Sequence, residues 1–220
     1  MLLPAWTVAE HTFSDTLGEP ESVLFPEEAA RVARAVSKRR QEYATVRVCA
    51  RAALGRLGYA PVPLLANRRG APLWPVGVVG SMTHCAGYRA AVVARSTTAA
   101  SIGIDAEPNG PLPAGLLDRI ALPAERDRLD RLAAHCPSTH WDRLLFSAKE
   151  SVFKTWYPLT GTELDFHEAD LTINPSDGTF AARLLVPGPV VGGERTEVFT
   201  GRWASASGLV VTAVVLPAPA

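Results

Sequence analysis

The chain has 220 residues, of which 47% are hydrophobic. This length and composition are enough to bury a core, as one large domain or two small ones in close contact, and they exclude a chain that is disordered in bulk. The 22 Lys and Arg residues balance 22 Asp and Glu residues, so no overall charge favours nucleic acid or an anionic membrane as a partner. Any basic site must therefore be local.

Cysteine usage and apolar runs indicate the compartment. Cys49, Cys85 and Cys136 lie far apart and form no CxxC pair, which is typical of reduced thiols rather than of a disulfide framework. The chain shows no signal-peptide pattern at its start, and no stretch approaches the roughly 18 apolar residues that a membrane span needs. We therefore expect a soluble, cytoplasmic protein.

Pro26, Glu27 and Glu28 predict the start of a helix, because proline loses no useful donor there and acidic side chains favour the positive end of the helix dipole. One long helix or two joined helices should follow and end at Gly58. The apolar stripe has helical spacing and consists of Val32, Val36, Tyr43, Val46, Ala50, Leu54 and Leu57. The other face is basic and carries Arg31, Arg34, Lys38, Arg39, Arg40, Arg47, Arg51 and Arg56.

Short strands, a break and a second helix follow. A loop is expected in the segment rich in proline and glycine at 61–76, and strands are expected at 78–81, 90–94 and 101–105. The prolines within 107–113 interrupt any regular element. Apolar residues at helical spacing then predict an amphipathic helix over 141–156, ended by Pro158 and Gly161.

The last part of the chain has the alternation of antiparallel strands between turn residues, at 171–173, 180–186, 198–203 and 209–215. Each half of the chain thus offers a helix and about three strands. We expect an α+β fold whose two halves, 1–107 and 108–220, meet at the proline-rich break.

Two acidic residues end the third predicted strand, in Gly103-Ile104-Asp105-Ala106-Glu107. The spacing of i and i+2 places both carboxylates on one face of an extended chain. Oxygen ligands on a rigid element suit Mg²⁺, which commonly shares its coordination shell with substrate phosphates. Taken alone, the pair is weak evidence, and two solvated acids at the end of a strand are the favoured interpretation.

The second helix contains Phe146-Ser147-Ala148-Lys149-Glu150-Ser151-Val152-Phe153-Lys154. Glu150 and Lys154 are an i, i+4 pair on one face, so a carboxylate for a metal or a proton and an ammonium for a phosphate can reach one ligand. The alternative is an ordinary surface ion pair worth about 0.3–0.5 kcal/mol.

The segment Gly80-Ser81-Met82-Thr83-His84-Cys85 follows a predicted strand and offers hydroxyls and an imidazole in a glycine-flanked turn. Such a turn can donate hydrogen bonds to a phosphate, and His84 can add charge if a nearby anion raises its pKa. A Cys85 nucleophile activated by His84 is an alternative. It is disfavoured because adjacent side chains of an extended chain point to opposite faces.

In this order, the three motifs resemble those of phosphopantetheinyl transferases of the Sfp/EntD type. The resemblance extends from the basic helix, with Arg39-Arg40-Gln41-Glu42-Tyr43, to the final strands. It implies an α+β fold of two similar halves related by a pseudo-twofold axis, with coenzyme A in the cleft between them. It further implies a monomer that transfers the 4′-phosphopantetheine group of coenzyme A to a serine of an acyl or peptidyl carrier protein and releases 3′,5′-ADP.

The resemblance also assigns roles to residues of the matching motifs. It implies Asp105, Glu107 and Glu150 as Mg²⁺ ligands, with Glu150 as the base that takes the serine proton. Lys154 would face the pyrophosphate. The remaining coenzyme A contacts that it implies are Thr83, His84 at the 3′-phosphate, Arg47, Arg51 and Arg69.

Two departures from the family pattern affect these assignments. Ala71 stands where better-known relatives have lysine before proline, which weakens the assignment of Arg69, and Phe146 replaces a tryptophan of the Sfp branch. A Mg²⁺-dependent nucleotide pyrophosphohydrolase could use the same three carboxylates but would direct water at phosphorus. A catalytically silent coenzyme A-binding protein is the third alternative, and the presence of all three carboxylates argues against it.

Overall fold

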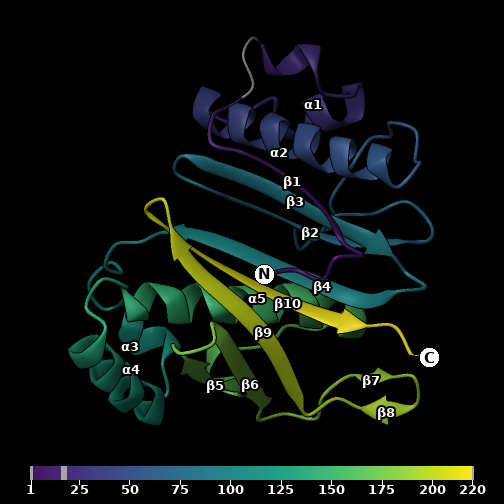
Figure 1. Ribbon diagram of the computed structural model, residues 1–220. Coiled ribbons are helices and arrows are strands. Elements are labelled where there is room, and N and C mark those ends of the chain that lie inside the picture. The colour runs from purple at the N-terminus through teal and green to yellow at the C-terminus, as the bar shows by residue number, and fades with distance from the viewer. Residues whose placement is uncertain (1, 16–18, 220) are drawn as a thin grey trace.

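A computed structural model describes residues 2–15 and 19–219 of the chain, so the outermost residues of the two predicted halves, 1 and 220, lie outside the described part. The fold is α+β with antiparallel sheets, as the sequence predicts (Figure 1). The first part of the chain contains β1 (Val8–Thr12), α1 (Pro26–Val32), α2 (Ser37–Arg56), β2 (Val78–Cys85), β3 (Tyr88–Arg95) and β4 (Ala99–Pro108). The second part contains α3 (Leu116–Ile120), α4 (Pro123–His135), α5 (Trp141–Thr160), β5 (Ala169–Asn174), β6 (Thr179–Leu184), β7 (Val190–Val191), β8 (Glu194–Arg195), β9 (Val198–Ala206) and β10 (Leu209–Pro217).

The first sheet has the strand order β1-β3-β2, and α2 covers one of its faces (Figure 1). The predicted helical region is two joined helices, because the chain leaves helical geometry between α1 and α2. Glu28 caps α1 by accepting a hydrogen bond from the backbone N–H of Phe25 at 3.0 Å. Small residues of α2 pack on the sheet in a cluster that includes Cys49, Ala50, Ala53, Leu54, Ala91 and Val93.

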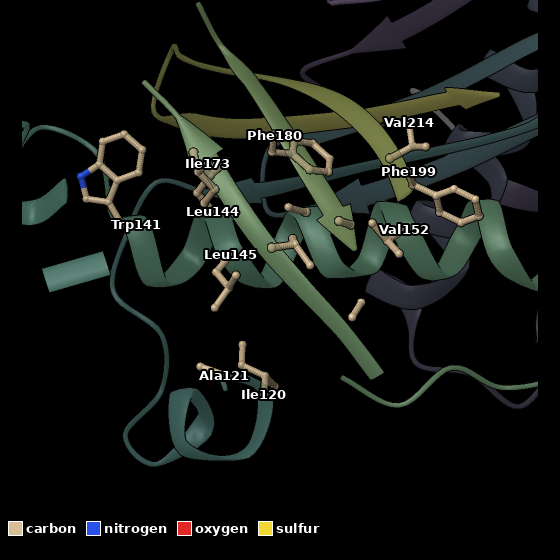
Figure 2. Packing of buried hydrophobic residues seen from close by; sticks show 14 of the residues in the cluster. Ile120, Ala121, Trp141, Leu144, Leu145, Val152, Ile173, Phe180, Phe199 and Val214 are labelled. Atoms are coloured by element: carbon tan, nitrogen blue, oxygen red, sulfur yellow. The ribbon is translucent and has the colours of Figure 1, made fainter. Parts of the chain in front are cut away.

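The second sheet has the order β4-β10-β9-β6-β5, and α5 packs on it. Figure 2 shows Leu144 and Val152 of α5 directed toward Phe180 and Phe199 of the sheet. This cluster is the largest part of the core. Because the apolar residues of α5 recur at helical spacing and are buried, the helix is held with one face on the sheet and the other free to line a site.

The strand β4 joins the two sheets. It pairs with β10, so Asp105 lies opposite Thr212. Its other edge faces β2, and here side chains of β2 accept the backbone N–H groups of β4. Ser81 Oγ accepts the N–H of Ile104 at 3.1 Å, and Thr83 Oγ1 accepts the N–H of Ala106 at 3.2 Å. By hydrogen bonding, β4 belongs to the second sheet, and the division at residue 107 stays a prediction.

Several details differ from the sequence prediction. The strand β1 and the helices α3 and α4 were not expected, and β2 continues through Cys85 where a turn was predicted. The helix α5 passes Pro158 and ends at Gly161, which adopts φ 69°. Proline is tolerated there because it lies in the last turn of the helix. No helix in the described ranges is long and apolar enough to cross a membrane.

Candidate active site

A cavity of about 990 Å³ lies between the two halves of the chain, bounded by α2, the loop at 66–74, β2, β4 and α5. Its size falls within the range usual for sites that bind small molecules and cofactors. The predicted site residues that line it are Arg47, Arg69, Thr83, His84, Asp105, Glu107, Glu150 and Lys154. Arg51 does not line it.

Alternate residues of β4 face α5, which brings the acidic motif of the strand to the motif of the helix. Lys154 Nζ donates to Asp105 Oδ1 at 2.7 Å and to the carbonyl of Ile104 at 3.1 Å. The second carboxylate oxygen of Asp105, Oδ2, is buried and accepts no hydrogen bond from the described residues. A buried anionic oxygen without a partner is costly and leaves room for a cation or a donor.

Glu107 and Glu150 lie near Asp105, and burial together with the negative charge of Asp105 raises the pKa of both glutamates. Burial raises the pKa of Glu107, as does the negative charge of Asp105, although Arg143 Nη1 donates to Glu107 Oε2 at 3.0 Å and opposes the shift. Burial also raises the pKa of Glu150, against the lowering effect of Lys154. Two glutamates with raised pKa values beside a third carboxylate are an arrangement found at functional sites.

The donor set suits Mg²⁺ in its chemistry, because all three side chains offer oxygen ligands and Asp105 Oδ2 has no hydrogen-bond partner in the described part of the chain. Among the described residues, however, no group of three or more His, Cys, Asp or Glu side chains is already gathered closely enough to hold a metal ion. Lys154 and Arg143 instead neutralise Asp105 and Glu107.

Thr83 and His84 lie within β2, so the prediction of a turn at this motif is wrong. The hydroxyl of Thr83 is buried and donates to Asp105 Oδ1 at 3.2 Å while it accepts the N–H of Ala106. Thr83 thus orients the Asp105 carboxylate and fixes the edge of β4.

His84 contacts Arg39 of α2 through Nε2 and lies 4.0 Å from a carboxylate oxygen of Glu42. Burial lowers the pKa of His84, and the positive charge of Arg39 lowers it further. Both effects favour the neutral imidazole, and the positive charge that the sequence suggested for His84 depends on a nearby anion. An anion between Arg39 and His84 would reverse this shift.

The alternative of a Cys85 nucleophile is not supported by the structure. Burial raises the pKa of the Cys85 thiol to about 12, and the negative charges of Glu107 and Asp105 act in the same direction. A thiol with this pKa holds almost no thiolate at neutral pH. Cys85 also does not line the cavity.

The two predicted arginines of α2 have different surroundings. Arg47 lies under the ring of Tyr43, 3.1 Å from its centroid, and Arg47 Nε donates to the carbonyl of Leu64 at 3.0 Å. Burial lowers the pKa of Arg47 to about 10, so it remains cationic at pH 7. Arg51 points to the buried Glu28, with Nη1 3.0 Å from both carboxylate oxygens. The structure therefore brings Arg47, but not Arg51, to the cavity.

Within the motif on α5, Glu150 and Lys154 line the cavity, whereas Lys149 lies in the interior of the protein. Lys149, next to Glu150, is buried and does not line the cavity. Its ammonium lies 2.9 Å from Glu125 Oε2 and donates to the carbonyl of Ala169 at 2.9 Å. The buried pair joins α5 to α4 and to the start of β5, which anchors the helix next to Glu150.

The sequence argument missed three charged residues of the site: Arg39, Glu42 and Arg143. Arg39 and Glu42 form an i, i+3 ion pair at 3.7 Å, a spacing that was visible on the predicted basic helix. Arg143 precedes Glu150 by seven residues, which is two helical turns and hence the same face of α5. Only the fold shows that these faces meet His84 and Glu107.

Comparisons with known proteins identify the relatives of this chain. Residues 27–94 match the model of the 4′-phosphopantetheinyl transferase N-terminal domain, and residues 101–204 match that of the 4′-phosphopantetheinyl transferase superfamily. The chain is 69% identical over 219 residues to 4′-phosphopantetheinyl transferase Svp of Streptomyces mobaraensis, covering 100% of this chain and 89% of the relative. It is 46% identical over 220 residues to 4′-phosphopantetheinyl transferase PptT of Mycobacterium tuberculosis, covering 98% and 96%.

A third relative, 4′-phosphopantetheinyl transferase Npt of Nocardia iowensis, is 46% identical over 210 residues, covering 91% of this chain and 93% of the relative. Similarity at this level over nearly the full length of three relatives shows a common family. This chain belongs to the 4′-phosphopantetheinyl transferase superfamily.

Proposed function

We propose that the chain transfers the 4′-phosphopantetheine group of coenzyme A to a serine of apo acyl or peptidyl carrier proteins, giving holo carrier and 3′,5′-ADP. One observation carries the proposal. Glu150 and Lys154 of α5 and Asp105 of β4 line the same cavity as the phosphate-binding candidates Arg47 of α2 and His84 of β2. The three similar full-length relatives, all named 4′-phosphopantetheinyl transferases, support the same activity.

In this mechanism Glu150 accepts the proton of the carrier serine as its hydroxyl attacks the β-phosphorus of coenzyme A. The raised pKa of Glu150 makes it a stronger base than an ordinary glutamate. Lys154 stabilises the charge that develops on the departing 3′,5′-ADP, and Arg47 and His84 hold the 3′-phosphate end. The residues act by positioning and charge stabilisation, which is what transfer from a pyrophosphate requires.

Mg²⁺ held by Asp105, Glu107 and Glu150 would supply charge neutralisation at the pyrophosphate. The unpartnered Oδ2 of Asp105 and the raised pKa values of the two glutamates support this assignment. We further infer that the protein acts as a monomer, because both walls of the cavity come from one chain. The spacing of its three cysteines, typical of reduced thiols, supports a cytoplasmic location. Light scattering at assay concentration tests the monomer directly.

The function is tested by incubating purified chain with coenzyme A, Mg²⁺ and several apo carrier proteins. Mass spectrometry should show each substrate carrier gaining one phosphopantetheine group. A parallel reaction without carrier separates a transferase from a pyrophosphohydrolase, since only the hydrolase would consume coenzyme A quickly there. Unmodified carriers together with rapid coenzyme A hydrolysis would overturn the proposal.

Dephospho-coenzyme A is expected to bind more weakly than coenzyme A, because it lacks the 3′-phosphate assigned to Arg47 and His84. Loss of charge-assisted hydrogen bonds worth about 1.5–3 kcal/mol corresponds to a dissociation constant roughly ten- to a hundredfold higher. Calorimetric titration of the two ligands measures the difference. Equal affinities for the two ligands would show that Arg47 and His84 do not bind the 3′-phosphate. Arg51 is expected to contribute less to the difference in affinity, because its guanidinium is directed toward Glu28.

Mg²⁺ without coenzyme A is expected to raise the melting temperature of the wild type, because a ligand that binds only the folded state stabilises it. Glu107→Gln should shift less at the same Mg²⁺ concentration, since it removes one proposed ligand. Asp130→Asn, an exposed carboxylate of α4 away from the cavity, is the matched control and should respond like the wild type. An identical Mg²⁺ response in Glu107→Gln would contradict the assigned ligand set.

A further inference from the structure

The loop at 66–74 forms one wall of the cavity, and the side chain of Asn67 holds the turn within this loop. Asn67 Oδ1 accepts the backbone N–H groups of Arg69 at 2.9 Å and Ala71 at 3.1 Å. The backbone of Asn67 closes the same turn, with its N–H donated to the carbonyl of Ala71 at 2.9 Å and its carbonyl accepting the N–H of Gly70 at 3.1 Å. The backbone that presents Arg69 is therefore held by Asn67.

The same side chain also crosses to the opposite half of the molecule. Asn67 Nδ2 donates to the hydroxyl of Tyr157 on α5 at 3.2 Å. Tyr157 lies three residues after Lys154 and seven after Glu150, which places all three on one face of the helix. Both Asn67 and Tyr157 are partly buried, and both line the cavity.

A second contact joins the loop to the segment after α5, between Arg69 Nη1 and Glu163 Oε1 at 2.6 Å. The two side chains are 63% and 61% exposed, so solvent screens this pair and it contributes little. Phosphate binding would also draw Arg69 away from Glu163. The hydrogen bond between Asn67 and Tyr157 is thus the better defined link between the loop and the helix.

We propose that Asn67 is a positioning residue for coenzyme A and that it holds the loop at 66–74 against the face of α5 that carries Glu150 and Lys154. This proposal rests on the proposed function and adds Asn67 to the residues that act in it. By fixing the loop, Asn67 sets the width of the cavity between its two walls and the point from which Arg69 meets the ligand.

Loss of the Asn67 side chain should weaken the binding of coenzyme A and leave the rate of the chemical step unchanged. Without Asn67 the loop must be ordered when coenzyme A binds, and that conformational entropy is subtracted from the binding free energy. The groups that remove the serine proton and stabilise the leaving group stay in place on α5. We therefore expect a change in KM for coenzyme A with kcat preserved.

Three variants test the proposal in the carrier-modification assay. Asn67→Ala should raise KM for coenzyme A about tenfold and leave kcat within about twofold of wild type. Tyr157→Phe removes only the hydroxyl and should raise KM about threefold, in a protein whose ring packing is retained. Because both changes break the same bond, the double variant should have a KM no higher than that of Asn67→Ala.

Asn174→Ala is the matched control, since Asn174 accepts the N–H of Ser176 at 3.0 Å in a similar turn between β5 and β6, away from the cavity. It should leave KM unchanged. The proposal is overturned by an unchanged KM in Asn67→Ala, by equal losses in kcat and kcat/KM, or by additive effects in the double variant. A wild type that modifies no carrier would instead overturn the proposed function.

Discussion

Glu150→Gln is expected to slow carrier modification by about two orders of magnitude or more, the usual scale for the loss of a general base. The substitution keeps the size and shape of the side chain but removes its negative charge and its ability to take a proton. If Glu150 were only half of a surface ion pair with Lys154, turnover would be nearly intact. Single-turnover rates of holo carrier formation, followed by mass spectrometry, distinguish the two cases.

Stability gives an independent check on this variant. The folded-state pKa of Glu150 is raised above its ordinary value by burial, so the folded protein binds its proton more tightly than the unfolded chain does. Stability is then lost as pH rises through the unfolded-state and folded-state pKa values, and at neutral pH the ionised side chain costs stability. In the absence of Mg²⁺, Glu150→Gln should therefore melt no lower than the wild type at pH 7.

The activity of the wild type should fall as pH decreases through the pKa that Glu150 has in the active, Mg²⁺-containing enzyme, because only the ionised form can act as a base. Glu150→Gln should lack this acidic limb. Binding of coenzyme A without metal should change little in the variant, since Arg47 and His84 are intact. A folded Glu150→Gln protein with near wild-type turnover would contradict the assignment of Glu150 as base.

Gly103→Ala is expected to have a large effect on the fold. A β-carbon at position 103 of β4 would lie 1.9 Å from the carbonyl oxygen of Ser151 and 2.4 Å from Thr155 Oγ1, both on α5. The nearest atom belongs to the backbone and cannot turn aside, so the strand and helix must separate. We expect a loss of about 3 kcal/mol or more in the free energy of unfolding, at or above the upper end for overpacked cores.

Because the strand carries Asp105 and the helix carries Glu150, the separation should also reduce activity. A displacement of about 1 Å between catalytic groups can cost roughly a hundredfold in rate. Denaturant unfolding and carrier modification at a temperature where the variant is folded measure the two effects. Gly55→Ala in α2 is the control: nothing lies within 4 Å of its added β-carbon, and alanine in a helix should be neutral or stabilising by up to about 1 kcal/mol. Wild-type stability in Gly103→Ala would refute the close packing of β4 on α5.

The elements that could be predicted are those whose local pattern matches their burial. The helix α5 buries apolar residues at helical spacing, including Trp141, Leu144, Val152 and Trp156. The helix could therefore be predicted from the spacing of its apolar residues in the sequence. The helix α4 was missed because it buries only Glu125 and Leu129, too few to give a stripe. Its start signal, Pro123 followed by Glu125, resembles the one that identified α1.

The motifs by themselves determined which family the chain belongs to and predicted which residues carry the chemistry, because carboxylates at i, i+2 and a Glu, Lys pair at i, i+4 are local patterns. Only the tertiary structure decided how they are used. It pairs β4 with β10, commits the Thr83 hydroxyl to Asp105 and Ala106, and turns Arg51 toward Glu28. These outcomes depend on partners far away in the chain, and the hydrogen-bonding and burial that select them exist only when the two halves are packed together.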